Sequence, residues 1–462
     1  MLILKRGVIL HRIKTDLCEG SLLGKIILYT IPIILTGILQ LLFNAADLVV
    51  VGRYCGSISV AAVGACGPVI NLMVNLFIGM SVGAGVCVAH GIGGGRPEDV
   101  HCTVHTAIPA ALIVGSVLTA AGVSGAGLIL RLMGTPDDVI KLSAVYMRLY
   151  FCGLIPNAVY NFGAAIIRAA GDTRSPLVYL TISGVVNVLL NLVFVILFNM
   201  DVAGVALATT ISQTLSAVLI LRALVRRDDA CRLSLRKMKL YKRQLARIFR
   251  IGVPAGIQGA LFSFSNVIIQ SSVNSFGAVV MSGNAAAQNI EGFVYTSMNS
   301  VSQTALNFTG QNYGAGKLDR VRRIMLICLG VVFFTGTVFG GIVYLNGGKL
   351  LSIYITDSPE AVKYGLIRMR WILLPYFLCG LMDVCTGAIR GLGRSVLPMM
   401  ITVVGVCGFR ITWIYTIFRL SAYHTLQNLY MSYMISWGVT FLSELIVFIV
   451  IMRKLSRSRQ GT

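Results

Sequence analysis

The chain has 462 residues, of which 56% are hydrophobic and 12% are charged, and its mean hydropathy is +0.82. This composition lies far outside the range of globular domains and excludes a soluble enzyme. The formal net charge of +22 would suggest nucleic-acid binding in a soluble protein, so the positions of the basic residues must decide what they do.

Twelve hydrophobic stretches, each of about 20 residues or more, follow one another along the chain. A bilayer core about 30 Å thick requires roughly 20 apolar residues per spanning helix. The pattern therefore predicts an all-α integral membrane protein with twelve transmembrane helices. The second and eighth stretches are long enough to contain a break. The predicted spans are 26–51, 58–90, 101–130, 140–165, 176–198, 202–224, 251–275, 281–309, 321–345, 364–388, 396–418 and 429–452.

The two halves of the chain repeat each other at an offset of 221 to 223 residues. Internal duplication is typical of transporters, and it predicts two pseudo-symmetric six-helix bundles, residues 1–224 and 251–462. A basic linker, 225–250, joins them and is expected to contact anionic lipid headgroups. Because each half has six spans, the repeats are parallel and their pseudo-twofold axis runs along the membrane normal. The clearest matches are Pro32 with Pro254, Gly95-Arg96 with Gly316-Lys317, and Arg168-Ala-Ala-Gly171 with Arg390-Gly-Leu-Gly393.

The basic residues are distributed unevenly between the two sides of the membrane. With both termini in the cytoplasm, 29 of the 39 Lys and Arg residues lie on that side, counting those that follow the fourth and tenth spans. This is the positive-inside distribution of membrane proteins. The basic residues are therefore expected to contact the lipid bilayer and not nucleic acid. The same distribution predicts a multi-pass protein of the bacterial inner membrane. Its first span is expected to be an uncleaved signal anchor.

No metal or cofactor is expected. The eleven cysteines lie mostly inside the spans and form no CxxC pair, so we interpret them as small buried residues. His101 and His105, close to Asp99 and Cys102, resemble half a metal site, but no zinc motif surrounds them. The glycine-rich connectors after the second and eighth spans lack the Lys-Ser/Thr of a nucleotide-binding loop.

The first span carries a row of polar residues that points to a functional site. Gln40, Asn44 and Asp47 are spaced i, i+4, i+7 and therefore share one face of a helix. Pro32, 15 residues before Asp47, can kink the same helix. Partners come from the fourth, fifth and sixth spans, which carry Asn157 and Asn161, Ser183, Asn187 and Asn191, and Thr209 and Gln213.

A carboxylate among amide and hydroxyl groups can hold either a proton or a desolvated monovalent cation. Burial raises the pKa of a carboxyl group, whereas a bound cation lowers it, and this competition is what an ion-driven antiporter needs. The alternative for the asparagines is plain hydrogen bonding between helices.

The second half offers another group of polar residues. Gln258, Gln288, Glu291 and Asp383 lie within predicted spans and are expected to form an acidic, amide-rich cavity suited to organic cations. Glu444, in the last span, is expected to pair with an arginine such as Arg410.

At these residues the chain resembles the multidrug and toxic compound extrusion (MATE) transporters over nearly its whole length. The resemblance rests on IPIILTGILQLLFNAADLVVVGRYCG in the first span, IRAAGDTRSPL after the fourth, FTGQNYGAGK after the eighth and IRGLGRSVLP after the tenth. It implies two six-helix lobes around a central cavity that opens alternately to each side. It also implies export of amphipathic, often cationic compounds, driven by inward flow of sodium ions or protons.

The resemblance also implies residue roles. In the branch of archaeal and DinF-like members, the ion or proton site corresponds here to Asp47, Asn187, Asn191 and Thr209, and Pro32 is the bending point of the first span. That branch usually has Asp where this chain has Asn191, so sodium and proton coupling both stay open. In the NorM-like branch the coupling carboxylates lie in the seventh and tenth spans; here the seventh has none.

Three functions compete for this pattern. The leading hypothesis is a monomeric secondary antiporter for drugs or toxins. The alternative is a flippase for lipid-linked oligosaccharides or polysaccharides from a related export family, which usually has a cationic cavity. An integral-membrane enzyme would show His, Asp or Ser clustered at one depth, and no such cluster is present, so we predict that the protein is not an enzyme.

Overall fold

The computed structural model describes residues 15–460 except residue 357, and every regular element in that part of the chain is helical. The first half contains α1 (Leu22–Tyr54), α2 (Ser57–Gly93), α3 (Pro97–Leu132), α4 (Asp137–Cys152), α5 (Leu154–Ala169), α6 (Arg174–Leu192), the π-helical η1 (Val193–Leu197) and α7 (Asp201–Val225). The 3₁₀ turn η2 (Leu235–Lys237) lies in the linker. The second half contains α8 (Lys242–Asn274), α9 (Ala278–Gly314), α10 (Leu318–Leu345), α11 (Gly347–Tyr354), α12 (Pro359–Leu373), α13 (Phe377–Gly391), α14 (Val396–Thr402), the π-helical η3 (Val403–Gly408), α15 (Phe409–Tyr415), the 3₁₀ turn η4 (Ser421–Tyr423) and α16 (Leu426–Gln460).

These helices occupy the predicted spans in order. In the described residues, nine helices are long and apolar enough to cross a bilayer, and two bent pairs, α4–α5 and α12–α13, raise the number to eleven. The remaining predicted span corresponds to α9, which has 37 residues but is richer in Asn, Gln, Ser and Thr. The chain is thus an all-α integral membrane protein with twelve spans, as predicted.

The breaks in the spans lie elsewhere than the sequence suggested. α2 and α9, which form the long second and eighth spans, are each continuous. The bends are instead in the fourth and tenth spans, by 42° between α4 and α5 and by 44° between α12 and α13. The same span is therefore bent in each half, which extends the internal repeat from sequence to shape.

The repeat also appears in the backbone at helix ends. Gly171, after α5, has φ +90°, and its counterpart Gly393, after α13, has φ +79°. Only glycine adopts this left-handed conformation without steric cost. The two Arg-x-x-Gly sequences therefore end equivalent helices with the same turn.

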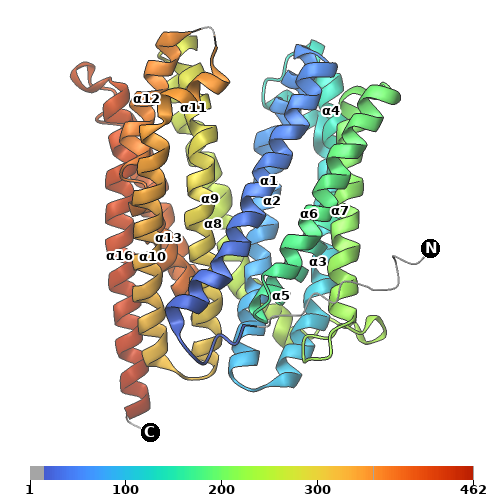
Figure 1. The fold of residues 1–462 in the computed structure, drawn as a ribbon, viewed down its shortest axis with the longest axis vertical. Coiled ribbons are helices and arrows are strands. Elements are labelled where there is room, and N and C mark those ends of the chain that lie inside the picture. The colour runs from blue at the N-terminus through green and yellow to red at the C-terminus, as the bar shows by residue number, and fades with distance from the viewer. Residues whose placement is uncertain (1–14, 357, 461–462) are drawn as a thin grey trace.

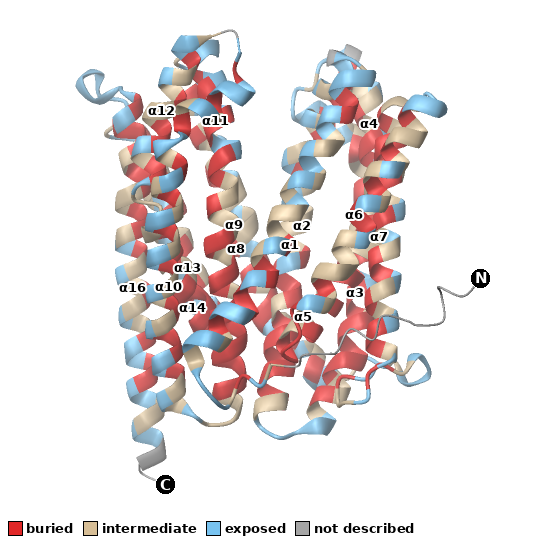
Figure 2. Ribbon diagram, in the orientation of Figure 1, coloured by how far each residue is buried: buried red, intermediate tan, exposed pale blue. Residues whose placement is uncertain are grey.

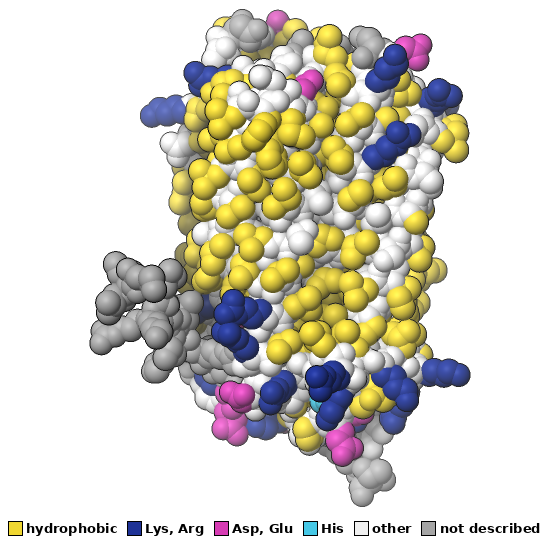
Figure 3. Space-filling view, turned by 90° about the vertical axis from the view of Figure 1, so that its right-hand side faces the viewer, with side chains coloured by type: hydrophobic (Ala, Val, Ile, Leu, Met, Phe, Trp, Pro, Cys, Tyr) yellow, Lys and Arg dark blue, Asp and Glu magenta, His cyan; other side chains and the backbone are white. Residues whose placement is uncertain are grey.

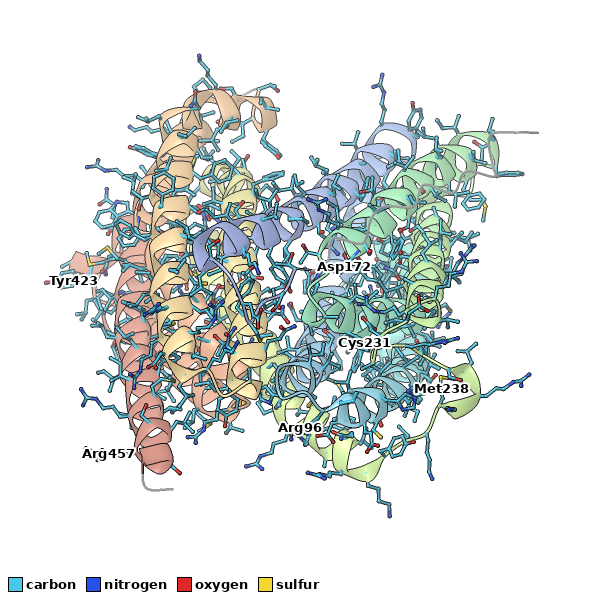
Figure 4. The ribbon with its side chains drawn as sticks, turned by 60° about the horizontal axis from the view of Figure 1, so that its bottom comes forward. Arg96, Asp172, Cys231, Met238, Tyr423 and Arg457 are labelled. Carbon is cyan, nitrogen blue, oxygen red and sulfur yellow. The ribbon has the colours of Figure 1, made fainter. Side chains whose placement is uncertain are left out.

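The linker ends earlier than predicted. α8 starts at Lys242, so the last part of the predicted linker belongs to a transmembrane helix. The stretch before it packs on the first half: Ser234 N donates to His105 Nε2 over 2.9 Å and Tyr241 N donates to Thr106 Oγ1 over 3.2 Å. Figure 4 shows Cys231 and Met238 at the same end of the molecule as Arg96 and Arg457.

Two groups of helices lie close together at one end of the molecule and diverge toward the other, where α4 and α12 begin (Figure 1). We call them the first and second lobes. Two helices cross between them. Ile26 and Tyr29, at the start of α1, pack in the core of the second lobe, whereas Val50 and Val51, near its end, pack in the core of the first.

The eighth helix makes the opposite crossing. Ile248 and Ile251 of α8 belong to the first-lobe core, while Ile269 and Val273 belong to the second. Each lobe core therefore contains part of a helix from the other half of the sequence. Figure 2 shows the buried residues running along the insides of both lobes and between them at the closed end.

The crossing of α8 over α2 depends on small residues. Gly79 and Gly83 of α2 face Gly252 and Gly256 of α8, so both helices present glycines four residues apart. A Cβ atom added to Gly79 would lie 2.2 Å from the backbone nitrogen of Gly256. Such small-residue pairs let two helices approach closely in a bilayer, where packing replaces the hydrophobic effect as the source of association.

The outer surface is that of a membrane protein. Large apolar side chains are exposed along the helices, among them Leu132 at 79% and Leu345 at 82%. In the view of Figure 3 they form a broad band, with Lys and Arg gathered mostly at the lower end. A water-facing surface would not keep such a band, whereas lipid chains solvate it.

A buried ion pair joins two helices of the second lobe. Arg368 of α12 contacts Glu291 of α9, with Nη2 2.7 Å from Oε2, and Arg368 Nη1 donates to Asn284 Oδ1 over 2.8 Å. Both charged residues are buried, and Tyr430 of α16 also donates to Asn284. The pair thus ties three helices together inside the lobe.

We expect Gly79→Ala to lower the free energy of unfolding by about 1–3 kcal/mol, because the added methyl group overpacks the α2–α8 crossing. Thermal unfolding of the purified protein in detergent measures the change. Gly64→Ala is the matched control, since Gly64 lies on the same helix with open space where its Cβ would be. Equal melting temperatures for the two variants would contradict the close crossing.

We expect Arg368→Met alone to cost about 3–5 kcal/mol of stability, because it leaves the Glu291 carboxylate buried and unpaired. The double variant Glu291→Leu/Arg368→Met removes both charges and should recover most of the loss. Denaturant unfolding of the two single variants and the double variant gives the coupling energy. Losses that simply add would show that the two side chains do not depend on each other.

Candidate functional site

A cavity of about 550 Å³ lies between the lobes. Its wall is formed by α1, α2, α4, α5, α6 and α7 of the first half and by α9 and α13 of the second. Nine of the polar residues predicted for this site line it, and all of them come from the first half: Gln40, Asn44, Asp47, Asn157, Asn161, Ser183, Asn187, Thr209 and Gln213.

Three helices bring the predicted ion-site residues together around Asp47. Asn191 Nδ2 of α6 donates to Asp47 Oδ1, and Thr209 Oγ1 of α7 lies 3.5 Å from Asp47 Oδ2. Asn187 Nδ2 donates to Thr209 Oγ1 over 3.3 Å, and Asn191 Nδ2 also lies 3.4 Å from Asn187 Oδ1. The four side chains form one connected network, with Asn191 fully buried behind the cavity wall.

The network leaves acceptor oxygens free and holds no basic group. The buried Asn191 Oδ1 has no hydrogen-bond partner among the described residues. Within the same part of the chain, no Lys or Arg forms an ion pair with Asp47. Carboxylate, amide and hydroxyl oxygens in this arrangement can accept a proton or a desolvated monovalent cation, since an ionised carboxylate in a membrane needs a positive partner.

The predicted residues of the second half lie outside the cavity wall. Glu291 is held by Arg368 in the buried ion pair described above, and Gln288 is exposed. Asp383 lies within hydrogen-bonding reach of Asn299, a wall residue, and Gln258 contacts the wall residue Arg390. The acidic second-half cavity expected from the sequence is therefore not assembled, because helix rotation turns its carboxylates into the lobe.

The expected pairing of Glu444 with Arg410 is wrong. Glu444 accepts hydrogen bonds from Thr386 Oγ1, over 2.8 Å to its Oε2, and from Thr402 Oγ1, over 3.0 Å. The Arg410 guanidinium instead stacks 4.0 Å from the centre of the Tyr433 ring. Cation–π contact stabilises a buried guanidinium without a carboxylate, and Arg410 Nε donates to Ser436 Oγ over 3.0 Å, while its two Nη atoms have no hydrogen-bond partner among the described residues.

Two arginines of the cavity wall escaped the sequence analysis. Arg168 and Arg390 line the cavity, although their position after the fourth and tenth predicted spans placed them among the cytoplasmic charges. α5 and α13 extend four and three residues beyond the predicted ends, which brings both side chains inside. The repeated Arg-x-x-Gly sequence was the signal, because the same arginine at the same place in both halves indicates equivalent surroundings in the two lobes.

The local turn after α5 fixes the position of Arg168. The chain reverses at Gly171, and Asp172 Oδ1 then accepts hydrogen bonds from the backbone nitrogens of Arg174 and Ser175 at the start of α6. The arginine therefore projects from the last turn of a firmly ended helix.

Hydrogen bonds between the lobes close this end of the cavity. Tyr29 Oη donates to the Arg168 carbonyl and Gln311 Nε2 to the Ala169 carbonyl, each over 2.7 Å. His90 Nε2 lies 2.7 Å from the Gly391 carbonyl. Because the other ends of the lobes diverge (Figure 1), the cavity is closed at the end that carries the α2–α3 and α9–α10 connections.

Comparisons with known proteins agree with this architecture. The family model described as MatE matches residues 32–193 and 254–416, once in each half. The probable multidrug resistance protein YoeA of Bacillus subtilis is 28% identical over 414 residues, which cover 87% of this chain and 88% of that protein. The probable multidrug resistance protein NorM of Thermotoga maritima is 23% identical and covers 83% of this chain and 82% of that protein.

Solved structures share the fold. A transporter of the MOP superfamily from Pyrococcus furiosus superposes with a TM-score of 0.89 at 20% identity, covering 95% of this chain and 98% of that one. The two matches to one family model reproduce the internal repeat that was read from the sequence. The chain belongs to the MatE family, the multidrug and toxic compound extrusion transporters, and it is a multi-pass membrane transporter of small molecules and not an enzyme.

Proposed function

We propose that the protein is a secondary antiporter that exports amphipathic drugs or toxins, driven by inward flow of protons or sodium ions through the Asp47 site. The observation that carries this proposal is the position of Asp47 in the cavity wall, bonded to Asn191 and Thr209 and free of ion pairs within the described chain. A carboxylate placed this way can exchange a cation with the aqueous cavity.

The crossing of α1 between the lobes provides the coupling. Tyr29 and Thr30, before Pro32, bond to α5 and α9 through the Arg168 carbonyl and Thr304. Asp47, on the same helix, bonds to α6 and α7. A cation bound at Asp47 changes the contacts of one half of α1, and bending at Pro32 passes the change to the closed end. Ion binding then shifts the population of lobe arrangements by its differential affinity for them.

Charge and chain organisation support the placement of the protein. We propose the bacterial inner membrane with both termini in the cytoplasm, since the linker, the α2–α3 turn and the C-terminal end of α16 carry the basic residues on one side (Figures 3 and 4). The cavity wall comes from one chain, so we propose that a monomer transports. It then opens, in the described conformation, away from the cytoplasm.

The flippase alternative keeps one supporting observation. A cationic cavity was the feature expected of a transporter for lipid-linked saccharides, and Arg168 and Arg390 stand in the wall. Against it, both relatives above are named multidrug resistance proteins. Drug export therefore remains the leading function, and the two are separated by whether a soluble dye or a labelled lipid-linked sugar crosses the membrane.

We expect Asp47→Asn to reduce gradient-driven transport to the level of empty liposomes, because the amide can exchange neither a proton nor a sodium ion. The measurement is dye movement in proteoliposomes, with proton and sodium gradients imposed separately and with anionic, zwitterionic and cationic dyes. Asp319→Asn is the matched control, since its side chain is 90% exposed at the α10 start. Wild-type transport by Asp47→Asn would refute the role of this carboxylate.

A further inference from the structure

We propose that the closed end of the cavity is a binding site for an anionic group of the transported compound, a carboxylate, sulfonate or phosphate held by Arg168 and Arg390. This rests on the proposed transport function and names its substrate class: an amphipathic organic anion or zwitterion. It differs from the organic cation expected from the sequence.

The charges of the cavity wall are predominantly basic. Among the residues that line it, the charged ones are Asp47, Arg168 and Arg390. The wall carries a net charge of +1 when Asp47 is ionised and +2 when Asp47 is protonated. Among the wall residues themselves, an anion therefore finds more positive than negative charge in both states.

Asp47 lies far along α1 from the backbone of Arg168, and among the described residues it forms no ion pair with either arginine. Tyr29 contacts the Arg168 carbonyl, and Asp47 follows 18 residues later along the same helix. At 1.5 Å per residue, about 27 Å of helix separates the two levels. The carboxylate and the helix ends that carry the two arginines therefore lie at different levels of the cavity.

The guanidinium groups have neutral hydrogen-bond partners and N–H donors that these partners do not use. Arg168 Nη1 donates to Gln303 Oε1 over 3.1 Å, and Arg390 Nη2 donates to Gln258 Oε1 over 2.8 Å. Among the described residues neither arginine forms an ion pair, and Arg390 Nε has no partner. A guanidinium has five N–H donors, so most remain available for a ligand that pairs with them bidentately.

The carboxylates nearest to Arg390 do not occupy it. Asp383 and Glu444 act on Arg390 electrostatically, but both lie outside the cavity wall, and Glu444 is held by two threonine hydroxyls. They lower the cost of holding a guanidinium in the membrane without blocking its cavity side. Wall residues Asn299 and Asn307 add neutral donors, and Tyr295 and Leu306 offer a surface for an apolar or aromatic body.

The test compares dyes that share one xanthene ring system and differ in charge: fluorescein as the anion, rhodamine B as the zwitterion and tetramethylrhodamine methyl ester as the cation. Binding to the full-length protein in detergent, without any gradient, is followed by fluorescence anisotropy. We expect fluorescein to bind at least tenfold more tightly than the cationic ester. Arg168→Gln and Arg390→Gln should each weaken fluorescein binding about tenfold and leave binding of the cationic ester unchanged or tighter.

Matched controls separate the site from general charge. Arg174→Gln and Arg394→Gln remove exposed arginines a few residues beyond each cavity arginine and should not change either affinity. Arg168→Lys and Arg390→Lys keep the charge and should keep the preference for the anion. If the glutamine variants do not purify as folded protein, the order of wild-type affinities decides the question.

Tighter binding of the cationic ester, or fluorescein binding that both glutamine variants leave intact, would overturn the anion site. If the cation were then transported in a gradient-driven, Asp47-dependent way, the proposed antiport would stand and only the anionic substrate class would be wrong. Displacement of fluorescein by phosphatidylglycerol but not by phosphatidylcholine would support the site and assign its anion to a lipid headgroup. Displacement by neither lipid, with fluorescein bound as expected, assigns it to a soluble compound.

Discussion

Hydrocarbon does not solvate a charge, and this constraint decides the role of every ionisable group in the fold. Glu291 is satisfied by Arg368, and Glu444 by two threonine hydroxyls. Asp383 lies beside Asn299, inside the second lobe. Asp47 alone among these four carboxylates lines the aqueous cavity, with amide and hydroxyl partners and no cation. The difference between a structural and a transporting acid in this chain is therefore its access to water.

The helices that cross between the lobes allow a cation at Asp47 to act on both lobes. If each lobe were built from its own half of the sequence alone, a cation at Asp47 would act on one lobe only. Because α1 begins in the second-lobe core and ends in the first, its two ends belong to different rigid bodies. Pro32 lies where α1 leaves the second-lobe core. The glycine crossing of α2 and α8 then serves as the close contact about which the lobes are held.

The sequence predicted the features that depend on one helix at a time. The spans followed from apolar length, the helix-ending glycines from the repeat, and the shared face of Gln40, Asn44 and Asp47 from helical periodicity. Features that depend on how helices rotate against each other were not predictable. Glu291 was expected in the cavity because nothing in one span shows that Arg368, 77 residues later, turns toward it.

The same limit explains the misplacement of Arg168 and Arg390. Hydropathy ends a span at the first charged residue, although a helix can continue with its arginine facing a polar cavity. The bends in α4–α5 and α12–α13 were not hidden in this way. Pro156, three residues after Gly153, and Pro375, within the second break, mark both positions, because proline interrupts the hydrogen bonding of a helix. The internal repeat held the missing information, since a charge preserved at one position in both halves has the same surroundings twice.

A substrate anion at the closed end constrains how antiport can work. An organic cation at Asp47 would compete directly with the coupling ion for one carboxylate. An anion bound by Arg168 and Arg390 has no such competition, and a proton taken up at Asp47 would even attract it. At roughly 27 Å that attraction amounts to only about 0.2–0.6 kcal/mol, whereas useful coupling between two sites takes about 1–3 kcal/mol. Exchange of ion for substrate must therefore run through the position of α1, whose Tyr29 contact with the Arg168 carbonyl is the mechanical link between the two ends of the cavity.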